Sequence, residues 1–384
     1  MDTYSEEAVR LLSDLVGIES VTPWLVPEGN GESAIVDHIG AFLEHHGIGV
    51  EVEEIAPGRF NLLATLQGRL PGPTLCLNAH TDTVGYDNWR SDALRPRVEG
   101  DLLIGLGAAD DKGGCAAIML ALKSLVSSPP DRGSVVAAFV ADEEALSIGS
   151  ERLVQREGID AAIVIEPIGL GEVVVAHQGF GWIDIITHGV AAHGSAPDAG
   201  VDSIIHMSWL ISALERLELE KFSKTVGEFC GKTVFHTSKI SGGTDYATYP
   251  TSTSLGIEIG TQPGENLQDR LQEIHGFIAE LSEEHPTLKA DVIVRLEREP
   301  FVAKGHERIL ESLSDASRSV LGADPVQVGL NAWTDAGLLQ SAGIPTILMG
   351  PTGGNFHAPG EWVSLPKLIQ FCAVLEATAR SYLR

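Results

Sequence analysis

Histidines and carboxylates at the ends of apolar segments are the residues of this sequence best suited to chemistry. Each lies where a predicted strand ends or a predicted helix begins: His80, Asp82, Asp110, Asp111, Asp142, Glu143, Glu144, Glu166 and His357. Any one alone has an ordinary explanation, as a helix cap, a solvated turn or a hydrogen-bonded histidine. Bringing several carboxylates together is costly without a cation to offset them. The set therefore predicts a metal site.

The types of ligand indicate which metal site this is. Imidazoles and carboxylates without a thiolate favour a hydrolytic zinc site over a structural one, which favours cysteine. The number of acids predicts two metals, because three ligating carboxylates and one hydroxide balance the charge of two divalent ions. Two ions roughly 3.5 to 4 Å apart can hold a hydroxide and polarise a substrate carbonyl. The expected reaction is hydrolysis.

The segments that position these residues alternate between strand and helix. Predicted strands TLCLNA, SVVAAFVA, AAIVIE and IPTILMG are interleaved with predicted helices KGGCAAIMLALKSLV, ERLVQREG and HERILESLSDASRSVLG. This alternation predicts an α/β fold with a mostly parallel sheet flanked by helices. Ligands of such sheets bind beyond the carboxyl ends of the strands, where these histidines and acids lie.

A second domain interrupts this pattern. Between residues 179 and 297 the order becomes strand, helix, two strands, helix, strand, beginning with the alternating segment GFGWIDIITHG. This order predicts an α+β two-layer insert of ferredoxin-like type. The sequence therefore predicts a catalytic domain in two parts, 1–178 and 298–384, around an inserted domain, 179–297.

Composition limits the functional class. The 384 residues include 53 acidic and 26 basic ones, a formal charge of −27 that disfavours nucleic acid and anionic lipid as partners. Adaptation to a salty habitat is the alternative explanation of this acidity. No run is long and apolar enough for a membrane span, and the N-terminus does not resemble a secretory signal. With four widely spaced cysteines, we expect a soluble, cytoplasmic protein that acts on a small molecule.

Several segments resemble those of a known family. AHTDTV, GLGAADDKGG, ADEEALSIGS, VIEP, HGVAAHGSAP and NFHAPGEWV are similar, in order and separation, to motifs of the dizinc hydrolases. That family includes aminoacylases, acetylornithine deacetylase, succinyl-diaminopimelate desuccinylase and the glutamate carboxypeptidases. The resemblance covers essentially the whole chain. It implies a zinc-peptidase-like catalytic domain, with the insert serving as lid and as the dimerisation surface of a homodimer.

The resemblance also implies roles for individual residues. The implied metal ligands are His80 and Glu166 for one ion, Glu144 and His357 for the other, and Asp110 as the bridge between them. Zn²⁺ is the first choice, with Co²⁺ or Mn²⁺ as alternatives. Among the implied catalytic residues, Glu143 is the general base and Asp82 orients His80. His193 would donate a hydrogen bond to the developing oxyanion; capping of a turn is its alternative explanation.

Two positions depart from the family pattern. Ala247, in GGTDYATYP, stands where many members have asparagine, and Gly260, in GTQPG, stands where they have the arginine that holds a substrate carboxylate. Either Lys232 or Arg270 would supply a clamp if the register differs. An arginine–carboxylate pair is a strong contact, so its loss favours a substrate that is not a standard N-acyl amino acid.

We therefore predict a metal-dependent hydrolase that cleaves an amide or related C–N bond of a small molecule. A dipeptidase or carboxypeptidase of the same family is the first alternative. A catalytically silent binding protein on the same fold is the second, although every implied ligand and the base are present. A phosphate-binding role for GLGAAD is disfavoured, because GxGxxG is absent and two acids follow.

Overall fold

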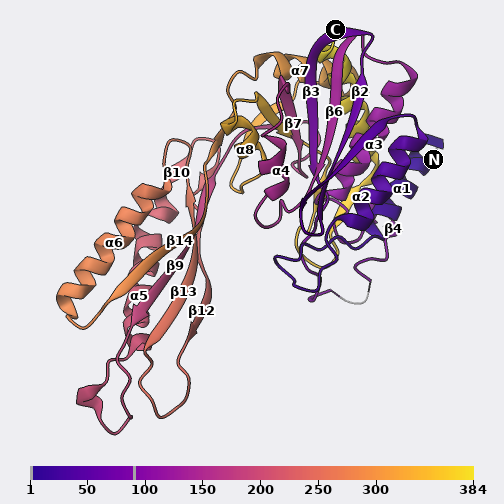
Figure 1. Ribbon diagram of the computed structural model, residues 1–384. Coiled ribbons are helices and arrows are strands. Elements are labelled where there is room, and N and C mark those ends of the chain that lie inside the picture. Colours follow the sequence, from indigo (N-terminus) through magenta and orange to yellow (C-terminus); the bar gives the residue numbers. More distant parts are fainter. Residues whose placement is uncertain (1–2, 90–91) are drawn as a thin grey trace. The chain divides into compact units, whose positions relative to one another are not determined.

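The computed structural model describes residues 3–89 and 92–384, which form two compact units (Figure 1). The first unit contains the chain up to residue 175, together with 303–328 and 338–384. The second contains 176–302 and 329–337. The insert expected at 179–297 thus falls within the second unit, which also takes in a short segment from the C-terminal part of the chain.

The first unit is built on a mixed sheet with strand order β1-β2-β6-β3-β7-β17-β8. The strands are β1 (Gly49–Ala56), β2 (Arg59–Gln67), β3 (Leu70–His80), β6 (Arg132–Val140), β7 (Ala161–Ile165), β8 (Glu172–His177) and β17 (Thr346–Met349). The predicted parallel sheet is confirmed for the four central strands, β6, β3, β7 and β17. The flanking strands β1, β2 and β8 run antiparallel to their neighbours. The short β15 (Phe301–Val302) and β16 (Val326–Leu330) pair with β8.

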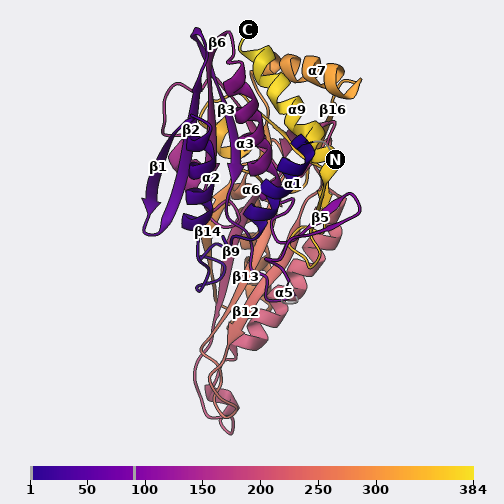
Figure 2. The same ribbon diagram turned by 90° about the vertical axis from the view of Figure 1, so that its right-hand side faces the viewer.

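Helices cover both faces of this sheet, which is why its central strands are continuous apolar runs. Figures 1 and 2 show α1, α2 and α3 on one face, and Figure 1 shows α4 on the other. The helices are α1 (Thr3–Val16), α2 (Ser33–His45), α3 (Lys112–Ser127), α4 (Ile148–Leu153), α7 (Glu307–Leu321), α8 (Ala336–Ser341) and α9 (Leu365–Tyr382). The helix expected over ERLVQREG is shorter and begins earlier, as α4. A core of fully buried aliphatic side chains from α1, α2, α3, α9 and the central strands joins these layers.

A small second sheet lies in the first unit, with strand order β18-β19-β5-β4. Its strands are β4 (Arg97–Glu99), β5 (Leu102–Ile104), β18 (Gly353–Gly354) and β19 (Trp362–Ser364). In the pairing of β19 with β5, Trp362 lies opposite Ile104. This sheet joins the segment that leads to Asp110 with the segment around His357, two parts of the chain that are far apart in sequence.

The second unit is the expected two-layer α+β fold. Its antiparallel sheet has the order β12-β13-β9-β14, and α5 and α6 pack on one face over a shared aliphatic core. The main elements are β9 (Gly179–His188), α5 (Ser203–Glu220), β12 (Phe235–Gly242), β13 (Ser252–Thr261), α6 (Leu267–Glu284) and β14 (Ala290–Arg298). Short elements connect them: η1 (Pro197–Ala199), η2 (Phe222–Lys224), β10 (Val226–Gly227) and β11 (Gly231–Lys232). The strand order and connections are ferredoxin-like, as predicted.

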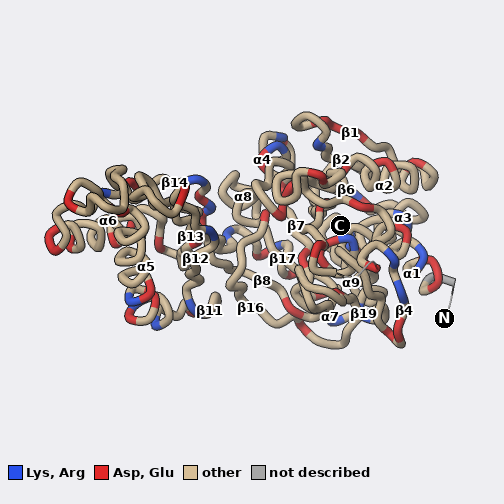
Figure 3. The backbone as a smooth tube through the Cα atoms, turned by 90° about the horizontal axis from the view of Figure 1, so that it is seen from below, with Lys and Arg blue, Asp and Glu red and all other residues tan. Residues whose placement is uncertain are grey.

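Acidic residues occur along both units (Figure 3), in keeping with the formal charge of −27. The four cysteines are all buried and free. Among the described residues, no helix combines the length and the apolar character that crossing a membrane requires.

Candidate metal centre

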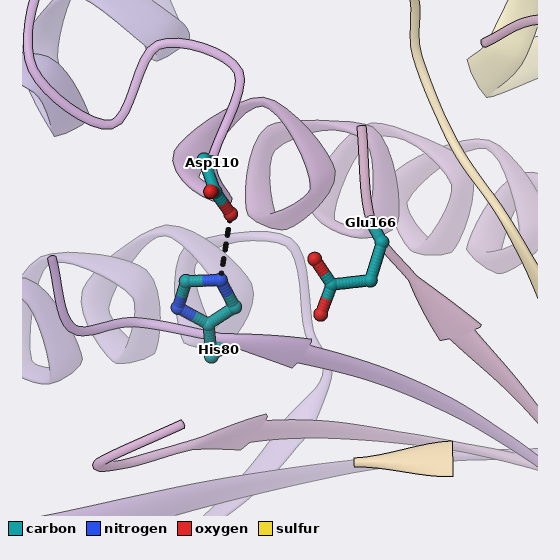
Figure 4. A group of neighbouring side chains, drawn as sticks. All are labelled: His80, Asp110 and Glu166. Carbon is teal, nitrogen blue, oxygen red and sulfur yellow. Dashed lines mark hydrogen bonds and ion pairs between the residues drawn. The ribbon is translucent and has the colours of Figure 1, made fainter. Parts of the chain in front are cut away.

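Three predicted ligands meet at the carboxyl ends of the parallel strands (Figure 4). His80 is the last residue of β3, Glu166 directly follows β7, and Asp110 comes from the turn before α3. Their ligand atoms lie within 4.8 Å of one another. The His80 Nε2 atom is 3.1 Å from Asp110 Oδ1. His80 and Glu166 are almost fully buried, so neighbouring strands hold both side chains rigidly.

A second group of ligands shares Asp110 with the first. Asp110, Glu144 and His357 also place ligand atoms within 4.8 Å of one another. The His357 Nε2 atom is 3.0 Å from Glu144 Oε2 and 3.4 Å from Asp110 Oδ2. The two oxygens of Asp110 therefore face different imidazoles, one in each group. This is the arrangement in which a single carboxylate can bridge two ions.

Asp82 has a wider role than orienting His80. The His80 Nδ1 atom donates to the backbone carbonyl oxygen of Asp82 at 3.0 Å, so in the neutral ring Nε2 is the unprotonated nitrogen that can bind a metal. The Asp82 carboxylate is 3.6 Å from the same Nδ1 atom. It also accepts hydrogen bonds from the backbone N–H groups of Glu143 and Glu144, at 3.0 and 3.1 Å. Asp82 thus links the first metal group to the loop that carries Glu143.

Residues that the sequence analysis did not identify hold this loop, residues 141–149, at both ends. The Asn61 side chain, on β2, donates to the Gly149 carbonyl oxygen at 2.9 Å and accepts from the Ala141 N–H group at 3.0 Å. Asn61 is 1% exposed. An amide within the apolar strand segment FNLLAT is the sequence signal that could have indicated it, because a buried amide needs partners.

Asp142 is the third anchor of the loop. Its backbone is left-handed, with φ of 68°, a conformation rare for residues other than glycine. The buried Asp142 carboxylate accepts from Arg59 and from Thr22, both at 2.8 Å. Arg59 is also paired with the buried Glu32. Because Asp142 directly precedes Glu143, this buried network determines where the predicted base lies.

The electrostatics of the metal-free centre show why a cation belongs there. Desolvation and the charge of Glu143 raise the pKa of Glu166 well above its usual value. Desolvation and the charge of Asp110 likewise raise the pKa of Glu144. Desolvation would also raise the pKa of Asp110, but hydrogen bonds with His357 and His80 lower it. Divalent ions would replace the protons that otherwise offset these buried charges.

The same shifts predict how the stability of the metal-free protein depends on pH. Hydrogen bonds with Asp110 and Glu144 raise the pKa of His357 to about 11, and desolvation raises the pKa of Glu361 to about 7. Desolvation would lower the pKa of His80, but hydrogen bonds with nearby acids raise it well above its usual value. Each group holds its proton in the folded state at a pH where the unfolded chain releases it. The free energy of unfolding should therefore fall as pH rises.

Groups with the opposite sign set the pH window for this measurement. Desolvation lowers the pKa of His177 to about 4 and that of Lys112 to about 8, and it also lowers the pKa of His46 and of His206. The histidines affect stability mainly below about pH 6.5, and Lys112 does so above about pH 8. Urea unfolding of the chelator-treated protein should therefore give a lower free energy of unfolding at pH 8 than at pH 6.5. The difference should be on the order of 1 kcal/mol, after allowing for the exposure of His357. The difference should shrink when metal is bound, and a rise in stability would contradict the expectation.

His193 lies in the second unit, on an exposed loop, whereas all five predicted metal ligands belong to the first unit. The Ser195 backbone N–H donates to His193 Nδ1 at 3.2 Å. Because a backbone N–H can only donate, the neutral ring carries its proton on Nε2. His193 therefore presents a hydrogen-bond donor to solvent, as an oxyanion donor requires.

Packing within the second unit leaves no room for a side chain at residue 260. A Cβ atom there would lie 2.6 Å from Gln178 Oε1 and 3.1 Å from the Val234 backbone. Gln178 cannot easily move, because its amide donates to the carbonyl oxygens of Cys230 and Lys232 and accepts from Val234. An arginine at residue 260 would therefore not fit this packing.

Arg270, one of the two residues considered as a replacement clamp, is not available for a substrate. It is 2% exposed, pairs with Glu265 and Glu273, and lies over the Phe222 ring at 5.0 Å from its centroid. That alternative is wrong, because the guanidinium is already used inside the unit. Lys232 is exposed, on β11.

Two adjoining imidazole–carboxylate groups at the carboxyl ends of a parallel sheet define a metal-dependent hydrolase. A family model confirms this class: residues 76–381 match peptidase family M20/M25/M40. The chain belongs to this family, whose members hydrolyse C–N bonds.

Individual relatives cover nearly the whole chain. The N-formyl-4-amino-5-aminomethyl-2-methylpyrimidine deformylase of Bacillus subtilis (strain 168) is 26% identical over 98% of this chain and 94% of its own length. The acetylornithine deacetylase of Proteus mirabilis (strain HI4320) is 28% identical, over 93% and 92%. The crystal structure of a tripeptidase from Staphylococcus aureus subsp. aureus Mu50 shares the fold, with a TM-score of 0.82, 22% identity and 99% of both chains covered.

Proposed function

We propose that this protein is an amidohydrolase of the deacylase type that uses two divalent metal ions, with Zn²⁺ as the first choice and Co²⁺ or Mn²⁺ as alternatives. His80 and Glu166 would hold one ion, and Glu144 and His357 the other. The observation that carries the proposal is the position of Asp110, whose two oxygens face the imidazoles of the two groups. The absence of a thiolate from either group fits hydrolytic rather than structural metal sites.

The protein's own groups would carry the proton transfers. When bound, the ions supply Lewis acidity to the amide carbonyl and lower the pKa of water. Glu143 accepts the proton released by the attacking water and passes it to the leaving nitrogen. Asp82 fixes the backbone of Glu143 through a hydrogen bond. The His193 Nε2–H group donates to the oxygen of the reacting carbonyl.

Dimerisation through the second unit and a cytoplasmic location are part of the proposal. Strands β12 and β14 are the edges of the four-stranded sheet, and α5 exposes Ile204 and Ile205, at 44% and 48%. Unpaired sheet edges and exposed apolar side chains are features that dimer surfaces use. Leu210 is buried, and the Trp209 ring stacks on His285 at 3.7 Å, so these two belong to the unit itself. Four free, buried cysteines fit a reducing compartment.

The substrate we propose is an amide that lacks a carboxylate next to the scissile bond. Packing excludes an arginine at residue 260, and Arg270 is buried in ion pairs with Glu265 and Glu273. The B. subtilis relative is named for removing a formyl group from an aminomethylpyrimidine, an amine without a carboxylate. Both observations support a neutral or basic amine as the leaving group.

A matched pair of amides tests this substrate class. N-acetylputrescine and N-acetylornithine differ chiefly by the carboxylate, which here meets no arginine. We expect kcat/KM for N-acetylputrescine to equal or exceed that for N-acetylornithine, because a buried carboxylate without a cationic partner costs on the order of a few kcal/mol. The measurement is steady-state kinetics on the metal-loaded protein, with the N-formyl aminomethylpyrimidine assayed as a third substrate.

The alternatives give different results in the same assays. Strong preference for N-acetylornithine would contradict the proposed substrate class. Faster cleavage of dipeptides or of C-terminal residues would establish the peptidase alternative. A folded protein that binds no divalent metal, or that binds metal but cleaves no amide or peptide, would be the silent binding protein.

A further inference from the structure

The Glu361 side chain is a buried carboxylate that the proposed mechanism does not use. It is 1% exposed, and it lies directly before β19, four residues after His357. It accepts three backbone hydrogen bonds from one turn: from Ala109 and Asp110 through Oε1, at 2.9 and 3.0 Å, and from Gly107 through Oε2, at 3.0 Å. No other carboxylate among the described residues of the metal centre accepts three backbone N–H groups.

These hydrogen bonds join two ligand-bearing segments that are far apart in sequence. The Gly107–Asp110 turn follows β5, and the His357 loop connects β18 to β19. Strands β5 and β19 are paired, and the Gly105 N–H donates to the Glu361 carbonyl oxygen at 3.0 Å. Glu361 therefore contacts the segment after β5 through both its backbone and its side chain. Moving this segment, residues 105–110, relative to the loop would break four hydrogen bonds.

The turn needs such an acceptor because its own backbone offers none for these N–H groups. Gly107 has φ of 71°, which turns the chain sharply, and the buried Ala109 N–H donates to the Glu361 carboxylate. Buried backbone donors are nearly always paired. The turn ends at Asp110, the ligand that both metal groups share, so its placement affects both groups at once.

We propose that Glu361 is a positioning residue of the metal centre, which holds the Asp110 turn in register with the His357 loop. The inference rests on the proposed two-metal function. Glu361 acts through its backbone partners and contacts neither substrate nor the reacting atoms. Residues that support a metal ligand typically contribute about 10–100-fold to metal affinity. Because Asp110 faces both groups, removing Glu361 should weaken both binding steps.

Titration of the chelator-treated protein with Co²⁺, followed by visible absorption and calorimetry, tests this. Glu361→Gln preserves size and one acceptor oxygen but sets an NH₂ group against one of the backbone donors, and Glu361→Ala removes every acceptor. We expect both Co²⁺ binding steps to weaken by about 10–100-fold in Glu361→Gln and by more in Glu361→Ala. The absorption bands should change, since they report ligand geometry. If Glu361→Ala does not fold, Glu361→Gln remains the test.

A matched control separates positioning from general destabilisation. Leu313, on α7, is 1% exposed and packs in the same unit away from the centre, so Leu313→Ala should lower stability without changing Co²⁺ affinity or spectrum. Wild-type affinity at both steps in the Glu361 variants, or equal losses in Leu313→Ala, would overturn the proposal.

The wild-type titration separates this inference from the proposed function. If the wild-type chain binds fewer than two Co²⁺ ions, the two-metal function fails, and the effect of Glu361→Gln on the remaining ion still decides the positioning role. If the wild-type chain binds two and Glu361→Gln binds them equally well, only the role of Glu361 fails.

Discussion

Replacing Glu143 by glutamine should abolish hydrolysis while leaving the metal centre filled. Glu143 belongs to neither ligand group, yet its charge raises the pKa of both Glu166 and His80, so its carboxylate lies near the first group. Its backbone is fixed by Asp82, and the residue before it is held by Arg59 and Thr22. These contacts do not involve the Glu143 carboxylate. The substitution should therefore remove the base without moving the loop.

The expected loss in kcat is at least about 10²–10⁴-fold, the usual contribution of a general base. Metal content, measured by elemental analysis, should stay at the wild-type value, and KM should change little. Glu151→Gln, at an exposed glutamate on α4, is the control with the same change in charge, and it should retain full activity. Metal loss in Glu143→Gln would make Glu143 a ligand instead, and retained turnover would remove it from the mechanism.

Replacing Asp110 by asparagine should abolish the binding of both metal ions with a single substitution. The Asp110 carboxylate is the only feature that the two ligand groups found among the described residues have in common. An asparagine offers one neutral oxygen in place of two anionic ones, and its NH₂ group would face one of the imidazoles. By contrast, Glu166→Gln and His357→Ala each affect a ligand of a single group. The loss in affinity should exceed the roughly 10–100-fold typical of residues that only support a ligand.

The adjacent residue provides a closely matched control. Asp111 is fully buried, and desolvation raises its pKa well above the usual value, so a neutral amide resembles its favoured form. Its side-chain oxygen accepts from Gly114 at the start of α3, which asparagine can also do. Calorimetric titration with Zn²⁺ should show no binding step in Asp110→Asn and two in Asp111→Asn. If Asp110→Asn kept one tight site, Asp110 would serve one ion and not bridge.

Much of the fold and many of the site residues could be predicted from local patterns. The central strands are short apolar runs with a histidine or acid directly after them, and burial on both faces makes such runs visible in sequence. His80, Glu144 and Glu166 were predictable for this reason. The alternation within GFGWIDIITHG likewise indicated a strand with one covered face. The antiparallel flanking strands were not predicted, because their pairing depends on partners far away in the chain.

Supporting residues were much harder to predict. Asn61 and Arg59 act on a loop more than eighty residues later, and Glu361 binds a turn about 250 residues earlier. Sequence spacing carries no information on such contacts. Asp82 illustrates the difference: its neighbour His80 indicated one role, whereas the hydrogen bonds to Glu143 and Glu144 appeared only in the structure.

The sequence by itself determined the class of chemistry, because ligand types and their places at strand ends depend on local composition and order. Its resemblance to the family also placed Gly260 where many members have a carboxylate-binding arginine. Only the tertiary structure decided that Asp110 lies between two imidazoles, that Gln178 fills the space beside Gly260, and that Arg270 is already paired. The physical reason is that a shared ligand, an excluded side chain and a buried ion pair are each defined by distances between segments remote in sequence.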